Sequence, residues 1–217
     1  MYAPWCKIND SYNDRIIDVP CTGYVAGHYA LNDMVRNVWW APAGFDRGTL
    51  NILGLSHVYD QGERDTVYPA GVNCLQTFRG YGHVIFGQKT LQKKASALDR
   101  VNVRRLLLMI EKSLVLTLRS FLFEPNSELT RFIAKATVDE FMTRLSAEGA
   151  FQTEAGDSGF LVICDTTNNT PAVIDSNELH MDVFVKPSKA AEFIQLQTIV
   201  TKSGTSFTEL ISRGSIL

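Results

Sequence analysis

Two neighbouring stretches in the middle of this 217-residue chain carry apolar residues at helical spacing. In residues 100–123 these positions recur every three or four residues, at Val103, Leu106, Leu107, Ile110, Leu114, Leu118, Phe121 and Leu122. Residues 127–148 repeat the pattern at Leu129, Phe132, Ile133, Ala136, Phe141 and Leu145. A Glu-Pro-Asn turn separates the two stretches, so the pattern predicts an antiparallel hairpin of two amphipathic helices. We expect the second helix to bury the six residues just named.

Segments typical of β-strands flank this predicted hairpin on both sides. Before it they lie at 2–8, 16–19, 73–78 and 83–87, and after it at 160–164, 180–186 and 193–201. The order predicts an α+β fold, with a mixed β-sheet packed against the long antiparallel helical hairpin and a C-terminal β-arm. We expect residues 1–192 to form a single domain and residues 193–217 to form the arm and tail.

Composition and spacing argue against several classes of protein. The chain is 45% hydrophobic and 20% charged, which is typical of a folded domain. It has no signal peptide, and its most apolar stretch is interrupted by charges, so we expect no membrane insertion. Its four cysteines and four histidines lack the spacing of metal or redox motifs. We therefore expect buried free thiols, no metal and no cofactor.

Charge is unevenly distributed although the net charge is only −2. Residues 1–78 sum to −3, residues 79–135 to +7 and residues 136–217 to −6. The basic middle could be a solvated helix face, a nucleic-acid surface or a surface for an acidic protein partner. The acidic flanks make a self-complementary assembly possible, in which the middle of one subunit faces the end of another.

A Gly156-Asp157-Ser158-Gly159 segment matches the neighbourhood of the nucleophile in trypsin-like proteases. Catalysis there needs a histidine base and a buried aspartate next to the serine. No histidine of this chain lies in the sequence context of those enzymes, and a chain centred on two helices is unlike their all-β barrels. A hydrolase is therefore a remote alternative, and a glycine-rich turn before a strand explains the segment.

The segment 193–200 is β-prone and lies near the C-terminus. It is either an ordinary sheet strand or an arm that adds to the sheet of a neighbouring subunit. Five residues are the candidates for this subunit interface: Phe193, Ile194, Leu196, Thr198 and Val200.

Several segments together resemble the C-terminal conserved region of contractile phage tail sheath proteins, in particular those of T4-like myophages. In order along residues 2–201 they are Trp40-Ala41-Pro42-Ala43-Gly44, Pro69-Ala70-Gly71-Val72-Asn73, Arg79-Gly80-Tyr81-Gly82-His83-Val84-Ile85-Phe86-Gly87, Val101-Asn102-Val103-Arg104-Arg105-Leu106, Phe123-Glu124-Pro125-Asn126 and Cys164-Asp165-Thr166-Thr167-Asn168-Asn169-Thr170-Pro171. Each segment alone is weak, but their order and spacing are specific.

This resemblance implies a structural protein and not an enzyme. Such subunits polymerise helically around a tail tube and contract to drive the tube through the host envelope. The implied partners are other sheath subunits, the tube protein, and baseplate and tail terminator proteins, without direct nucleic-acid contact. The implied location is the virion, after assembly in the host cytoplasm. The sheath of a related injection machine, a pyocin or a type VI secretion apparatus, is the close alternative.

The resemblance also bears on individual residues. Sheath subunits stay connected by exchanging terminal arms, which maps the C-terminal arm onto the 193–200 segment. Arg104, Arg105 and Lys112 are candidates for charged contacts with the tube or with other subunits. Sheath chains are usually much longer, so we expect this sequence to be a fragment or a split sheath gene product.

Overall fold

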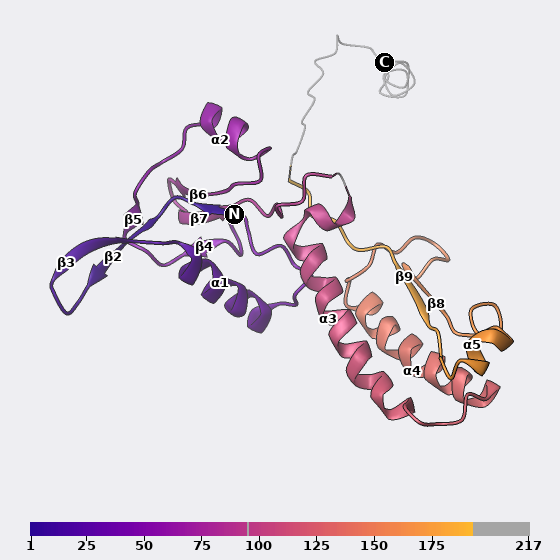
Figure 1. Ribbon diagram of the computed structural model, residues 1–217. Helices are drawn as coiled ribbons and strands as arrows, with labels where there is room; N and C mark the ends of the chain where they lie inside the picture. Colours follow the sequence, from indigo (N-terminus) through magenta and orange to yellow (C-terminus); the bar gives the residue numbers. More distant parts are fainter. Residues whose placement is uncertain (95, 193–217) are drawn as a thin grey trace, which may run out of the picture.

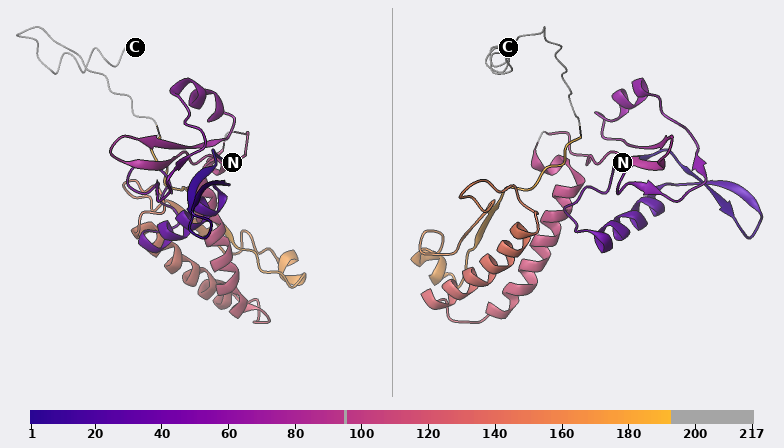
Figure 2. Two further views of the ribbon diagram at one scale, coloured as in Figure 1. Left: turned by 90° about the vertical axis from the view of Figure 1, so that its left-hand side faces the viewer. Right: turned by 180° about the vertical axis from the view of Figure 1, so that it is seen from behind.

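A computed structural model describes residues 1–94 and 96–192 of the chain. Two lobes lie next to each other, one with most of the strands and one with the two longest helices (Figures 1 and 2). The α+β class predicted from the sequence is confirmed. The strands divide among three sheets of four, three and two strands, instead of forming the one mixed sheet that we expected.

The first lobe contains the two larger sheets. One has the order β1 (Tyr2–Ala3), β6 (Asn73–Phe78), β7 (Gly82–Phe86) and β4 (Thr49–Leu50), with β1 parallel to β6 and the other pairs antiparallel. The other has the antiparallel order β3 (Arg15–Val19), β2 (Cys6–Asp10) and β5 (Gly54–Leu55). Helices α1 (Thr22–Val35) and α2 (Gln61–Val67) complete this lobe.

A hydrophobic cluster joins these sheets to α1. Its buried members are Cys6, Cys21, Val25, Leu50, Leu55, Leu75 and Ile85. The mixed sheet therefore shares its core with α1 and not with the two long helices. All four cysteines are buried free thiols, as predicted, and burial raises the pKa of the Cys6 thiol to about 11.

The second lobe contains α3 (Val101–Leu118), α4 (Glu128–Ala147), α5 (Pro171–Asp175), β8 (Phe160–Ile163) and β9 (Asp182–Val185). Short 3₁₀ turns, η1 (Ala97–Asp99) and η2 (Arg119–Phe121), precede and follow α3. Helices α3 and α4 lie side by side (Figures 1 and 2). The second hydrophobic cluster joins them to β8, with Trp39, Leu106, Ile110, Val138, Met142, Leu145, Ala150, Phe151 and Val162 as its buried members.

Local chemistry explains where the long helices begin and end. The Ser127 hydroxyl accepts a hydrogen bond from the Thr130 amide (3.2 Å), which caps the first turn of α4. Gly149, with φ of +83°, follows the end of α4. Helix α3 has Arg100 at its cap position, without a side-chain cap. It also ends at Leu118, five residues before the predicted end at 123.

Residues 88–90 and 99–101 form the joint between the two lobes. The amide of Val101 donates to the Gln88 carbonyl (2.8 Å), and the amide of Thr90 donates to the Asp99 carbonyl (2.9 Å). The joint is thus a short antiparallel backbone pairing that leads directly into α3.

Asn73 and Gly87 support this joint from the first lobe. The fully buried Asn73 amide group donates to the Lys89 carbonyl (2.8 Å) and accepts from the Lys89 amide (2.7 Å). A Cβ at Gly87 would lie 2.8 Å from the Tyr68 ring and 2.9 Å from the Asn73 side-chain oxygen. Two of the segments that carry the family resemblance, ending at Asn73 and at Gly87, therefore meet at the joint.

Candidate functional site

Strands β8 and β9 form a two-stranded ribbon on the second lobe. They pair antiparallel, with Phe160 opposite Val185 and Leu161 opposite Phe184. Because successive strand residues point to opposite faces, the ribbon has a core face and an outer face. The core face packs on the cluster shared with α3 and α4. On the outer face Leu161 and Phe184 are 54% and 57% exposed.

Both strands of the ribbon are edge strands within the described part of the chain. The main-chain groups on the outer side of each strand are therefore available to another strand. Large apolar side chains beside such an edge favour pairing with a further strand instead of contact with water.

A polar network closes the loop that connects the two strands. The buried Asn169 side chain donates to the carbonyls of His180 (2.8 Å) and Asp165 (3.2 Å) and accepts from the His180 amide (2.7 Å). Its neighbour Asn168 donates to Ile163, the last residue of β8, and to Asp182, the first of β9. These asparagines therefore hold the ends of the ribbon together, which gives the Cys-Asp-Thr-Thr-Asn-Asn-Thr-Pro segment a structural role.

The candidate cations on α3 occupy different environments. Arg104 and Lys112 are exposed and, with Arg119, lie near one face of the helix. None of the three forms an ion pair with a described residue. The exposed apolar residues Leu108 and Val115 lie between them on that face. We name this set the basic–apolar face; the exposed Glu111 lies on the same side of the helix.

Arg105 contacts α1 of the same chain. Its guanidinium pairs with the carboxylate of Asp33 and lies 4.8 Å from the ring centre of Tyr29. The Arg105 side chain is only 19% exposed. The structure therefore gives this arginine an internal role, in holding the two lobes together.

Helix α4 buries a different face from the one that the spacing predicted. Leu129, Phe132, Ile133 and Ala136 were expected to be buried, but all four are exposed. The buried residues are Arg131, Ala134, Val138, Met142 and Leu145. Leu145 confirms its own prediction, and Phe141 is partly buried.

The physical reason is that the first half of α4 is apolar on two sides. The small Ala134 and Val138 pack in the core, and the buried Arg131 guanidinium is satisfied by the Asn126 side chain (2.8 Å) and carbonyl (3.0 Å). We name the exposed set Leu129, Phe132, Ile133 and Ala136 the α4 stripe. Such a stripe at an exposed surface is typical of a protein–protein interface.

The described residues do not assemble the catalytic triad of the hydrolase alternative. Ser158 donates to the Phe160 carbonyl (3.4 Å), and Asp157 pairs with Lys186. All four histidines lie in the described part of the chain, and their hydrogen-bond partners are elsewhere: Arg47, Glu63, Thr77 and Glu178. The segment forms a tight turn, with φ of +87° at Gly156 and +77° at Gly159. The described residues also include no cluster of metal ligands and no helix long and apolar enough to cross a membrane.

The interface predicted from the sequence differs from the surfaces that the structure exposes. The candidate arm residues Phe193, Ile194, Leu196, Thr198 and Val200 lie outside the described residues. The ribbon and the α4 stripe were not predicted as interfaces. In the sequence, apolar residues of an exposed surface look the same as apolar residues of the core. Only the fold, through the burial of their neighbours, identifies them as exposed.

Comparisons with known proteins relate this chain to tail sheath proteins. The family described as phage tail sheath C-terminal domain matches residues 93–201. The tail sheath protein of Vibrio phage KVP40 is 39% identical over 203 residues, which are 93% of this chain and 29% of that protein. The tail sheath protein of Enterobacteria phage T4 is 35% identical over 202 residues, 93% of this chain and 30% of that protein. The chain thus spans about 30% of the length of these two relatives.

Solved structures with the same fold come from contractile machines. A chain of the anti-feeding prophage baseplate superposes with a TM-score of 0.83 and 25% identity, over 93% of this chain and 54% of that chain. A chain of the PVC sheath complex, an extracellular contractile injection system in its contracted state, superposes with a TM-score of 0.83 and 26% identity. The match covers 91% of this chain and 55% of that chain.

Proposed function

This chain belongs to the phage tail sheath C-terminal domain family, and from this premise we propose that it is a structural subunit of a contractile tail sheath. In this role it polymerises helically around the tail tube as part of the virion, after assembly in the host cytoplasm. Contraction drives the tube through the host envelope. The work comes from the free-energy difference between two packings of the same subunits and needs no catalytic step.

The open β8–β9 ribbon is the observation that supports this proposal most. In a polymer, a strand from a neighbouring copy adds to the β8 edge or the β9 edge, and its side chains pack beside Leu161 or Phe184. The donor is the C-terminal arm of that copy, with Phe193, Ile194 and Leu196 among its residues. At about 0.5–1.5 kcal/mol per main-chain hydrogen bond, five or six bonds plus the buried apolar side chains hold two subunits firmly.

The basic–apolar face of α3 has the second role in the proposal. Arg104 and Lys112, with Arg119 beside them, contact an acidic surface of the tail tube or of another subunit. Baseplate and tail terminator proteins bind the two ends of the polymer. Arg105 belongs to the same motif but contributes through its internal pair with Asp33.

A related contractile injection system is the second candidate. The structural similarity to the anti-feeding prophage and PVC proteins favours it, whereas the higher sequence identity to two phage sheaths favours the tail. Electron microscopy of the native particle distinguishes the two functions: a DNA-filled head on the sheath supports the phage tail, and a headless particle supports a pyocin or type VI apparatus.

Truncation tests the polymer directly. We expect the chain without residues 193–217 to remain folded and to form no sleeves in negative-stain electron microscopy. The matched control lacks only residues 202–217 and keeps the candidate arm, so it should polymerise like the full chain. Normal sleeves from the shorter variant would show that the arm does not join the subunits.

A further inference from the structure

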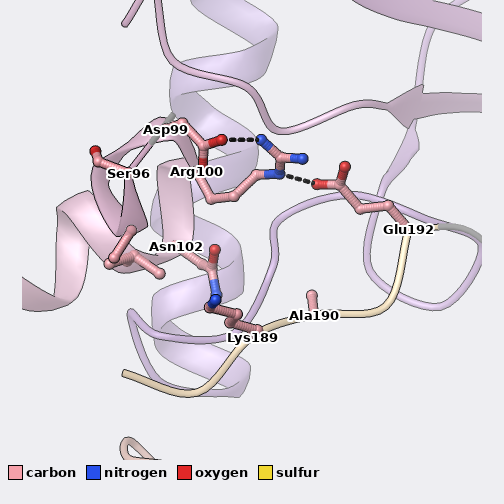
Figure 3. Close-up of a pocket in the computed structure, with 9 residues that line it drawn as sticks. Ser96, Asp99, Arg100, Asn102, Lys189, Ala190 and Glu192 are labelled. Carbon is pink, nitrogen blue, oxygen red and sulfur yellow. Dashed lines mark ion pairs between the residues drawn. The ribbon is translucent and has the colours of Figure 1, made fainter. Parts of the chain in front are cut away.

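The chain leaves the ribbon after β9 and returns to the joint between the lobes. Residues 186–188 still pair with the segment before β8, where the Ser188 amide donates to Ala150 (3.0 Å) and its hydroxyl to Gly149 (3.1 Å). Beyond that point the chain passes the start of α3 (Figures 1 and 3). The last described residue, Glu192, therefore lies at the joint between the lobes and not at the ribbon.

The Glu192 carboxylate contacts two side chains at the joint. One oxygen lies 2.6 Å from the Arg100 Nε atom, an ion pair drawn as a dashed line in Figure 3, and the other accepts a hydrogen bond from the Tyr68 hydroxyl (2.8 Å). Asp99 holds the Arg100 guanidinium from its other side, at 2.9 Å. The Glu192 side chain is only 15% exposed, so this ion pair is screened less than a surface pair.

The two contacts of Glu192 come from different lobes. Arg100 precedes α3, whereas Tyr68 follows α2 and its ring lies against Gly87. The Lys89 ammonium, from the joint itself, lies 4.3 Å from the centre of the Tyr68 ring. Burial, together with the neighbouring Glu192, raises the pKa of Tyr68 above its usual range, so the phenol stays protonated and can donate.

We propose that Glu192 is the positioning residue of the C-terminal arm. It fixes the point from which the arm leaves the subunit, and it transfers tension in the arm to the joint between the lobes. This inference rests on the arm-exchange function proposed above.

The mechanical reason lies in the order of contacts along the chain. Without the Glu192 contacts, tension would act first on Ser188 and Lys186 and then on β9. When tension pulls one end of a ribbon, its hydrogen bonds break one after another. The Glu192 contacts form a clamp between the arm and these bonds, so the tension passes to two folded lobes instead. The arm can then stay attached to a neighbour while subunits reorient, without separation of β9 from β8.

Hydrogen exchange of the unpolymerised full chain tests the clamp independently of assembly. In Glu192→Gln we expect roughly tenfold faster exchange at the Ser188 amide, the hydrogen-bonded amide of this segment, than in the original chain, because the charge-assisted contact to Arg100 is lost. Glu178→Gln is the matched control, since Glu178 is an exposed carboxylate on the same lobe, and it should leave this segment unchanged. Equal exchange in the two variants would overturn the clamp.

A charge swap separates positioning from a general loss of stability. Arg100→Glu and Glu192→Arg each place two like charges together, and both should speed exchange and reduce sleeve formation. The double variant restores the pair and should recover both properties at least in part. Failure of the folded double variant to slow exchange overturns the inference. If the original chain forms no sleeves while exchange behaves as expected, the clamp stands and the proposed function fails.

Discussion

Leu161 on β8 and Phe184 on β9 lie directly opposite each other on the outer face of the ribbon, and each is more than half exposed. A cross-strand apolar pair contributes only about 0.2–1 kcal/mol to folding. Its exposed area is far better explained by contact with another chain than by stability of the single subunit.

Replacement of this pair tests that explanation. We expect Leu161→Ser/Phe184→Ser to lower the free energy of unfolding by about 1 kcal/mol or less and to abolish sleeves in electron microscopy. Val162→Ser, on the buried face, is the contrasting control and should cost about 2 kcal/mol or more. Normal sleeves from the double variant would mean that the outer face of the ribbon is not an interface.

The α4 stripe leads to a second prediction. Phe132→Ser changes an exposed side chain, so the free energy of unfolding should stay within about 0.5 kcal/mol. The concentration needed for polymerisation, measured by light scattering, should rise. Met142→Ala, on the buried face of the same helix, should instead lower stability by about 2–5 kcal/mol. An unchanged critical concentration for Phe132→Ser would leave the stripe without a role in assembly.

Two adjacent arginines on α3 should behave differently. Arg105→Ala removes the partner of Asp33 and should lower the free energy of unfolding by about 1–3 kcal/mol in urea titration. Arg104→Ala should change it by less than about 0.5 kcal/mol but should weaken assembly, most strongly at low salt. The reverse pattern would contradict the assignment of Arg105 to the inside and Arg104 to the outside.

The sequence predicted the presence of both long helices but not their exposed faces. Apolar spacing locates α3 and α4 because it follows from the helical repeat. It could not say which side of α4 is buried, because both Phe132 and Met142 lie in apolar stripes. The fold buries the side that carries Ala134, Val138 and Met142. Arg104 and Arg105 are likewise indistinguishable in a sequence, since only the fold brings Asp33 to one of them. The Glu192 contacts join positions that are up to 124 residues apart, so no local sequence pattern predicts them.

The Asp157–Lys186 pair predicts part of the acid sensitivity. The hydrogen bond from Lys186 holds the pKa of the Asp157 carboxyl below its usual range, and the Gly159 amide adds to the effect. The pKa of the Asp157 carboxyl is lower in the folded chain than in the unfolded chain. The pair therefore stabilises the fold at neutral pH, and this contribution is lost as the pH falls below about 4.

Melting temperatures as a function of pH check this assignment. Asp157→Asn should melt at a lower temperature than the original chain at pH 7, and the difference should shrink at acid pH. Asp10 and Asp165, whose pKa values are also lowered by hydrogen bonds, are unchanged in the variant and contribute acid sensitivity of their own. A difference in melting temperature that is constant with pH would rule out a charged Asp157 as its source.

A cryo-electron microscopy map of the assembled sheath tests the central claim most directly, through the environment of the β8–β9 ribbon. The account predicts a strand from a neighbouring subunit about 4.7–4.9 Å from β8 or β9, hydrogen-bonded along its edge, with side chains packed beside Leu161 or Phe184. A ribbon that remains two-stranded in the assembly, with both side chains exposed to solvent, would contradict it.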